Sequence, residues 1–180
     1  MRYTDEHKAT VRAKIIAEAS AALRRAGLDG VSIPALMKRA GLTHGGFYAH
    51  FEDRDELVAE AVEHAARQTR DAVFENATGL EDVFDVYLSR DHVRHPERGC
   101  VVAALGADAP RQRAVVRKAF SYAATGLLSL VQKKLGGKAD PLSDEAIERA
   151  ALMVGAVVLA RLIDDDALVD RLLSIARRQR

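Results

Sequence analysis

The residues from Thr43 to Phe51, THGGFYAHF, combine hydroxyl, imidazole and phenol groups with two adjacent glycines and contain no acidic side chain. Hydroxyl, imidazole and phenol groups form hydrogen bonds with phosphates and base edges, whereas a carboxylate would repel a phosphate. Two glycines in a short helix each cost about 1 kcal/mol relative to alanine. They either relieve crowding in a tight turn or allow the backbone to lie close to a DNA edge. The chemistry of this segment therefore suits a polyanion.

Two short helices are predicted to position this segment. The first runs from about Ile33 to Ala40, with Ser32 as its N-cap, and the second runs from His44 to His50. A connection through Gly41 joins them, which is the helix-turn-helix arrangement. Apolar residues on one side of the pair are expected to face inward: Ile33, Leu36, Met37, Ala40, Leu42, Phe47 and Phe51.

Apolar residues recur every three or four positions along the rest of the chain, and alternation with a period of two is hard to find. The spacing predicts an all-α protein of about nine helices. We expect helices over residues 10–26, 33–40, 44–50, 80–91, 100–107 and 111–135, with others capped by Asp53 and Ser143 and a final one that carries Leu168, Leu172 and Ile175. The chain divides into an N-terminal helical domain, residues 1–52, and a C-terminal helical domain, residues 53–180.

Composition bounds the class of protein. The chain has 180 residues, 48% hydrophobic and 29% charged, which is typical of a folded globular protein. Its single cysteine, Cys100, excludes an internal disulfide and a cysteine-rich zinc site. The N-terminus lacks the apolar run of a signal peptide, and the longest run without a polar side chain, Ala150–Ala160, is too short to span a bilayer. We expect a cytoplasmic protein with no membrane partner.

Positive charge is concentrated at one end of the chain. Residues 1–50 contain eight basic and four acidic side chains, a net charge of +4, so the other 130 residues carry −3 of the total of +1. A basic region on a nearly neutral chain suits an anionic partner that meets the N-terminal end only. Ordinary solvated charge explains the same bias, so the bias does not decide between the two.

The stretch from Ile16 to Val62 resembles the DNA-binding domain of TetR-family transcriptional regulators. The run Gly41-Leu42-Thr43-His44-Gly45-Gly46-Phe47-Tyr48-Ala49-His50-Phe51, followed by Arg54 and Leu57, carries the resemblance. The resemblance implies a helix-turn-helix DNA-binding domain and a C-terminal domain for ligand binding and dimerisation. It also implies a ligand-responsive homodimeric repressor, without a cofactor, that binds double-stranded DNA at a palindromic operator and is released by a small-molecule effector.

The same resemblance implies which residues contact DNA. It places Ser32 and Lys38 near the DNA backbone, makes Thr43 onward the recognition helix, and puts Arg54 on a phosphate. Pro34 departs from the pattern, because many members carry a polar or basic side chain there. The predicted DNA-binding residues are Ser32, Lys38, Thr43, His44, Gly45, Gly46, Tyr48, His50 and Arg54. Burial of the Tyr48 ring and simple solvation of Lys38 are the structural alternatives.

The C-terminal part is expected to bind the effector and the second subunit. Ala150–Ala160 is apolar all round, as in a helix buried on every side, and with the last helix it resembles the dimer surface of the family. An intramolecular core helix is the alternative. The predicted interface residues are Val154, Val157, Val158, Leu168, Leu172 and Ile175. The predicted ligand-binding residues are Phe84, Tyr87, Cys100, Phe120, Tyr122 and Met153.

Cys100 supports a second hypothesis. A thiol at a helix N-terminus beside Arg98 is favoured as thiolate and reacts with electrophiles or oxidants, although a small buried hydrophobe is the alternative. His92, His95 and Cys100 lie at spacings that allow a metal ligand set, but a structural role is favoured. No phosphate loop, catalytic triad or paired metal motif is present, so we expect no enzyme. A helical ligand-binding protein without DNA-binding activity and a protein-interaction module are the remaining alternatives.

Overall fold

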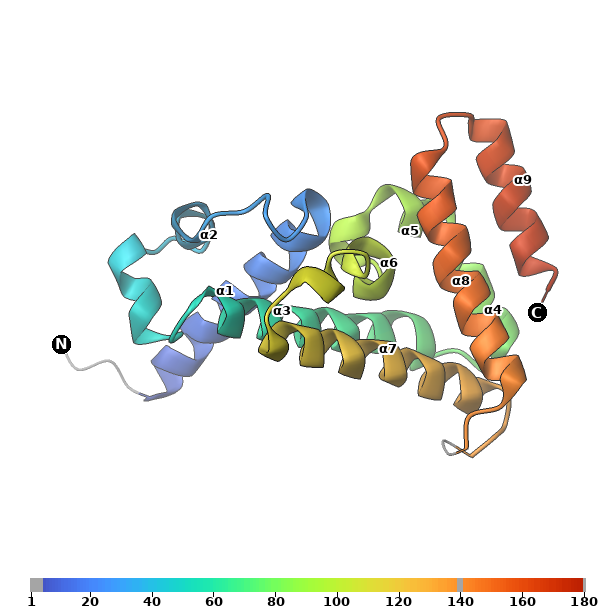
Figure 1. Ribbon diagram of the computed structural model, residues 1–180, viewed down its shortest axis with the longest axis horizontal. Coiled ribbons are helices and arrows are strands. Elements are labelled where there is room, and N and C mark those ends of the chain that lie inside the picture. Colours follow the sequence, from blue (N-terminus) through green and yellow to red (C-terminus); the bar gives the residue numbers. More distant parts are fainter. Residues whose placement is uncertain (1–4, 139–140, 180) are drawn as a thin grey trace.

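The computed structural model describes residues 5–138 and 141–179, and the described residues form helices, turns and loops without a strand. Nine α-helices are present within these residues, as the apolar spacing predicted (Figure 1). Their bounds are α1 Asp5–Ala26, α2 Ile33–Arg39, α3 Arg54–Thr69, α4 Leu80–Tyr87, α5 Arg90–Arg94, α6 Val101–Leu105, α7 Ala114–Lys134, α8 Asp144–Leu162 and α9 Asp166–Arg177. The described residues also contain four short helical segments that are not α-helices: η1 His44–Ala49, η2 Arg70–Phe74, η3 Pro96–Arg98 and η4 Ala109–Arg111.

Local capping explains several of the helix ends. The side chain of Asp53 accepts a hydrogen bond from the Glu56 backbone N–H at 2.9 Å and begins α3. Ser143 begins α8 in the same way, through Ala146. Gly27 ends α1 with a φ of +82°, a conformation that side-chain-bearing residues rarely adopt. These positions are where the sequence predicted them.

Two predicted helices were wrong in detail. The helix expected over residues 80–91 is two helices, α4 and α5, because Leu88 leaves the helical conformation and the Ser89 side chain caps a new helix through the His92 backbone N–H. The segment from His44 is a 3-10 helix rather than an α-helix, with hydrogen bonds such as the His50 N–H to the Phe47 carbonyl. Adjacent glycines favour α-helix poorly, which is consistent with this tighter and shorter turn.

Helices α3 and α7 lie side by side through the centre of the molecule, and α1 crosses α3 at one end (Figure 1). The first hydrophobic core joins α1, α2, η1 and α3 with residues of α6 and α7, including Val101 and Phe120. The second core joins α4, α6, α7, α8 and α9. The N-terminal helices are therefore not packed as an isolated unit, because the first core continues into the C-terminal part.

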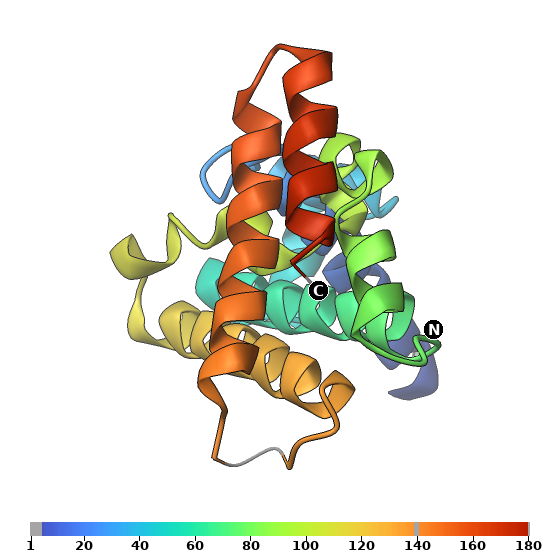
Figure 2. The ribbon, with the colours of Figure 1, turned by 90° about the vertical axis from the view of Figure 1, so that its right-hand side faces the viewer.

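Helices α8 and α9 form an antiparallel pair at the end of the molecule that lies away from α2 (Figure 1, and face-on in Figure 2). Helix α7 is the one helix in the described part of the chain with the length and mean hydropathy to cross a membrane. It packs against α3 along one side and against α8 near its end.

Candidate nucleic-acid interface and effector cavity

Aromatic packing on the buried side of η1 holds this turn in place. Phe47 is fully buried and stacks on Phe51, with ring centroids 5.4 Å apart. Met37 of α2 is also fully buried, so the turn is held against α2 from the inside. A short turn with one buried side and a fixed neighbour can present its other side in a defined orientation.

The outer side of η1 is polar and accessible. Tyr48 is 66% exposed, and its ring meets Phe47 edge-to-face at 5.2 Å. Thr43 and Gly45 are exposed, whereas Gly46 is half-buried. On α2, Ser32 and Lys38 are exposed, and the Ser32 hydroxyl also caps α2 through the Ala35 N–H. The side chain of His44 lies outside the described residues.

His50 and Arg54 are less free than the other predicted DNA-binding residues. The His50 ring is half-buried, and its Nδ1 has no hydrogen-bond partner among the described residues. Burial, with Lys8 and Arg12 nearby, lowers the pKa of His50, which disfavours the charged imidazolium. The Arg54 guanidinium donates to the Leu28 carbonyl, which ties the start of α3 to the turn after α1.

Arg12 is a positioning residue that the sequence analysis missed. Its guanidinium donates to Glu56 at 2.8 Å and to Glu60, both on α3, and its Nε donates to the His50 carbonyl at 3.1 Å. It also lies 4.5 Å from the centroid of the Phe51 ring. These contacts raise the pKa of Arg12, chiefly through the hydrogen bond to Glu60. Two glutamates four residues apart, with no lysine or arginine three or four positions away from either, were the available signal.

A single peptide unit at the start of α6 links the two halves of the chain. Its carbonyl, that of Gly99, accepts a hydrogen bond from Arg24 Nη1 of α1 at 2.6 Å. Its N–H, that of Cys100, donates to His92 Nε2 at 2.9 Å, while His92 Nδ1 hydrogen-bonds the Tyr87 carbonyl at 2.6 Å. A Cβ at Gly99 would lie 2.4 Å from the His92 ring, so this close approach requires glycine.

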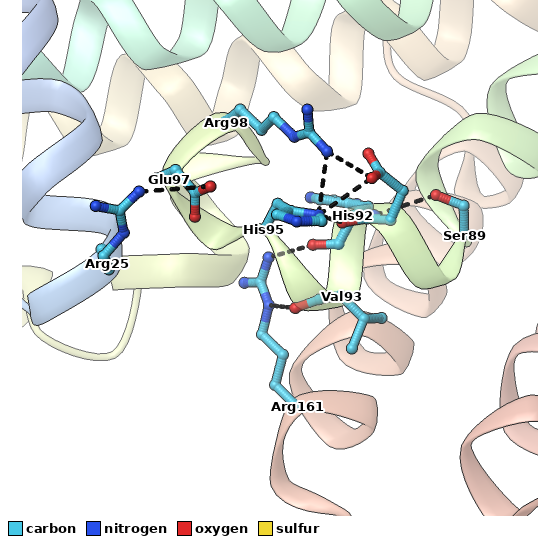
Figure 3. Close-up of polar contacts among 9 residues, drawn as sticks. Arg25, Ser89, His92, Val93, His95, Glu97, Arg98 and Arg161 are labelled. Carbon is cyan, nitrogen blue, oxygen red and sulfur yellow. Dashed lines mark hydrogen bonds and ion pairs between the residues drawn. The ribbon is translucent and has the colours of Figure 1, made fainter. Parts of the chain in front are cut away.

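The two side chains that bind this peptide unit, those of Arg24 and His92, are both buried. Arg24 is 4% exposed, and burial lowers its pKa to about 10. Burial lowers the pKa of His92 to about 4, so the imidazole is neutral near pH 7 and accepts from Cys100 as the contact requires. Arg161 of α8 donates to the carbonyls of His92 and Val93 at the end of α5 (Figure 3).

Arg98 was expected beside the Cys100 thiol, but its observed contacts are with other residues. Arg98 is exposed and donates to Asp91 at 2.5 Å, and it also contacts His95 (Figure 3). Cys100 itself is 3% exposed and is the N-cap of a five-residue helix. Within residues 5–138 and 141–179, no three His, Cys, Asp or Glu side chains are grouped as a metal site would need.

One cavity, called the main cavity below because it lies where α3, α6 and α7 meet, has a volume of about 390 Å³. This volume is within the usual range of ligand sites. Of the six residues predicted to bind a ligand, Cys100 and Tyr122 line it. Phe84, Tyr87 and Met153 are instead fully buried in the second core, and Phe120 belongs to the first core and lines a different hollow. Cys100 also lines a second cavity, of about 440 Å³, beside His92.

The outer face of the α8–α9 pair exposes apolar side chains. Val158, Leu168 and Ile175 are exposed, and Val154 and Leu172 are half-buried. Val157 was wrongly expected at this face, since it is fully buried within the second core. Leu159 and Leu162 of α8 were not predicted at the interface, yet both are exposed, Leu162 at 75%.

Comparisons with known proteins agree with this architecture. The family model described as "Bacterial regulatory proteins, tetR family" matches residues 15–61, about a quarter of the chain. No curated protein matches the sequence. Among solved structures, the chain is similar to a TetR-family transcriptional regulator from Cytophaga hutchinsonii, with a TM-score of 0.74 and 20% identity over 99% of this chain and 96% of that one.

Two further structures have the same fold. A TetR transcriptional regulator from Chloroflexus aurantiacus has a TM-score of 0.73 and 21% identity, over 96% of this chain and 95% of that one. Escherichia coli NemR in its reduced form has a TM-score of 0.73 and 18% identity, over 94% and 96% of the two chains. Residues 15–61 therefore match the family model of TetR-type regulatory proteins, and the described part of the chain has the helical fold of these solved regulators.

Proposed function

We propose that the protein is a homodimeric repressor that binds a palindromic operator in double-stranded DNA through η1 and α2 and is released by a small-molecule effector. The observation that carries the proposal is the outer side of η1, which presents Thr43, Gly45 and Tyr48 on a turn anchored by the buried Phe47. No acidic side chain occurs between Asp29 and Glu52. This surface is chemically suited to phosphates and base edges.

Basic side chains around this surface supply the attraction to phosphate. Lys8 and Lys14 on α1 are exposed, as are Lys38 and Arg39 at the end of α2. Each lysine or arginine that neutralises a phosphate releases counterions and makes binding depend more steeply on salt. Ser32, Gly46, His50 and Arg54 are the additional residues that we propose at the edge of the interface, together with His44.

A second subunit would cover the exposed apolar face of α8 and α9. Several exposed apolar side chains on two neighbouring helices are typical of a protein–protein interface. The two-fold symmetry of a dimer would place two η1 turns on one face of the DNA, about one helical turn of roughly 34–36 Å apart. That arrangement would suit a palindromic operator, and the protein would act in the cytoplasm with its DNA.

Helix α3 supplies a route from effector to DNA. Its N-terminus, capped by Asp53, follows η1 directly, and its last residues Ala66, Arg67 and Thr69 line the main cavity. An effector in the cavity that displaces the end of α3 would change the angle at which η1 is held. Coupling of this kind is typically worth about 1–3 kcal/mol.

Selection of random duplexes by the purified protein tests the proposal, followed by binding measurements on the selected duplex. We expect a palindrome, and we expect Tyr48→Ala to weaken binding about tenfold, because one polar contact to DNA is worth about 1–3 kcal/mol. Tyr122→Ala, measured without effector, is the matched control, since Tyr122 is 64% exposed on α7 and lines the cavity rather than η1. Lys38→Gln should lower the slope of log affinity against log salt by about one.

Failure to enrich any duplex at low salt would contradict the DNA-binding proposal. Enrichment of a site without two-fold symmetry would contradict the homodimer instead. Equal losses from Tyr48→Ala and Tyr122→Ala would mean that η1 is not the reading surface.

A second candidate is a regulator that responds to oxidants or electrophiles through Cys100. The observation in its favour is that Cys100 lines both cavities, although its accessible fraction is only 3%. One of the similar structures, that of NemR, is described as a reduced form. On the selected duplex, hydrogen peroxide should weaken binding by the unsubstituted protein but not by Cys100→Ser. Equal responses of the two proteins would exclude this candidate.

A further inference from the structure

The main cavity has an apolar floor and a basic rim. Its floor includes the buried residues Val101, Ala123 and Leu127. Arg67, Arg70 and Lys133 are exposed and lie around its opening, where α3 and α7 run side by side (Figure 1). No aspartate or glutamate is among its lining residues. The cavity therefore combines apolar walls with positive charge at one place.

The carboxylates near the rim do not prevent its basic side chains from binding an anionic ligand. Arg70 pairs with Asp71 at 2.7 Å, and Arg67 approaches Glu63 at 3.9 Å, but both pairs are exposed and neither carboxylate lines the cavity. Exposed ion pairs contribute little, so an incoming anion can replace them. An adjoining hollow of about 420 Å³ shares Arg70 and Lys133, so these two cations stand between two open spaces.

Polar groups deeper in the cavity are few. The Thr69 hydroxyl donates to the Ala65 carbonyl and is occupied by its own helix. The Thr125 hydroxyl donates in the same way to carbonyls of α7, and the other lining hydroxyls are those of Tyr122 and Ser129, so an uncharged ligand would meet mostly apolar surface. If the ligand carries a negative charge, the basic rim can bind that charge and fix the orientation of the ligand, which the apolar floor cannot do.

We propose that this cavity binds an organic anion, a carboxylate or sulfonate on a hydrophobic skeleton, with its charge between Arg67, Arg70 and Lys133 and its skeleton against Val101, Ala123 and Leu127. The inference rests on the proposed function in one respect, since it names the chemical class of the effector. It does not depend on DNA, because the binding itself is measured on the free protein.

Two matched fluorescent probes test the role of charge. 1-Anilinonaphthalene-8-sulfonate carries a sulfonate on an aromatic skeleton, and N-phenyl-1-naphthylamine has the same skeleton without the charge. We expect the sulfonate to bind saturably at one site per chain and more tightly than the neutral probe. Arg67→Gln and Lys133→Gln should each weaken binding of the sulfonate about two- to fivefold, as for a half-exposed charge pair, and leave the neutral probe unchanged.

Gly126→Leu tests the place of binding. Gly126 lies in the middle of α7 and lines the cavity, and a Cβ there meets no atom within 4 Å. Leucine is a better helix former than glycine, so the helix should tolerate the change while the new side chain occupies cavity space. Both probes should then lose binding. Lys118→Gln is the control for charge, because Lys118 is exposed on the same helix and is not among the cavity's lining residues.

Three results would overturn the inference. The first is equal affinity for the two probes, and the second is sulfonate binding that survives Gly126→Leu in a protein whose thermal unfolding is unchanged. The third is an equal effect of Lys118→Gln and Lys133→Gln. Because none of these measurements uses DNA, a protein that selects a palindrome but fails them would retain the proposed function and lose only this ligand class.

Discussion

Between about pH 7.5 and about pH 5, the unfolding free energy is expected to fall by about 2 kcal/mol because of His92 alone. Burial lowers the pKa of the folded imidazole to about 4, whereas a histidine in an unfolded chain titrates near 6.5. Between these values the unfolded chain binds a proton that the folded chain does not. The stabilisation is therefore complete above about pH 6.5 and is lost as the pH falls toward 4.

The contacts of His92 explain why the folded protein resists this proton. Its Nε2 accepts the N–H of Cys100, and a proton on Nε2 would face that donor directly. Its Nδ1 already contacts the Tyr87 carbonyl, and Arg161 lies nearby with a positive charge. Protonation of Nε2 would break the hydrogen bond that it accepts from the Cys100 N–H at the start of α6.

Urea unfolding of the unsubstituted protein and of His92→Gln, at both pH values and a fixed protein concentration, measures the effect. Glutamine keeps one donor and one acceptor but does not titrate, so the variant should lose less stability on acidification by about 2 kcal/mol. Most carboxylates titrate below this window. His95→Gln, on the outer side of the same segment, is the control and should behave as the unsubstituted protein. An identical acid response of His92→Gln would contradict the prediction.

Arg24→Met is expected to lower the unfolding free energy by about 1–3 kcal/mol. Methionine keeps much of the apolar stem but removes the donors to Gly99, Gln68 and Ser20. The Gly99 carbonyl lies in a buried residue, and an unsatisfied buried acceptor has a cost of this size. Removal of a buried charge offsets part of the loss, because the guanidinium no longer needs to be desolvated.

Arg25→Met is the matched control for Arg24→Met. Arg25 is the next residue, its side chain is 60% exposed, and its contact with Glu97 is long, at 3.5 Å. Its replacement should change stability by no more than about 0.5 kcal/mol. Equal unfolding midpoints for the two variants, with equal urea dependence, would mean that the bond between Arg24 and Gly99 does not stabilise the link between α1 and α6.

The features that were predicted correctly from the sequence depend on interactions between residues close together in the chain. The stop at Gly27 and the caps at Asp53 and Ser143 depend on residues within one helical turn, so they can be read directly from the chain. The helix-turn-helix was recognisable for the same reason, since its buried stripe and its acid-free segment are both local patterns. The Ser89 cap that divides residues 80–91 was a local signal too, but the continuous apolar stripe concealed it.

The tertiary structure decided which buried and charged groups meet. Arg24 and Gly99 are 75 residues apart, so no rule of residue spacing relates them. They nevertheless share a hydrogen bond. Helical periodicity gives the side of a helix that is apolar, but not the partner that covers it. For that reason Val157 and Phe120 could be identified as apolar and still be assigned to the wrong surface, whereas the cavity beside Cys100 became visible only when α3, α6 and α7 were brought together.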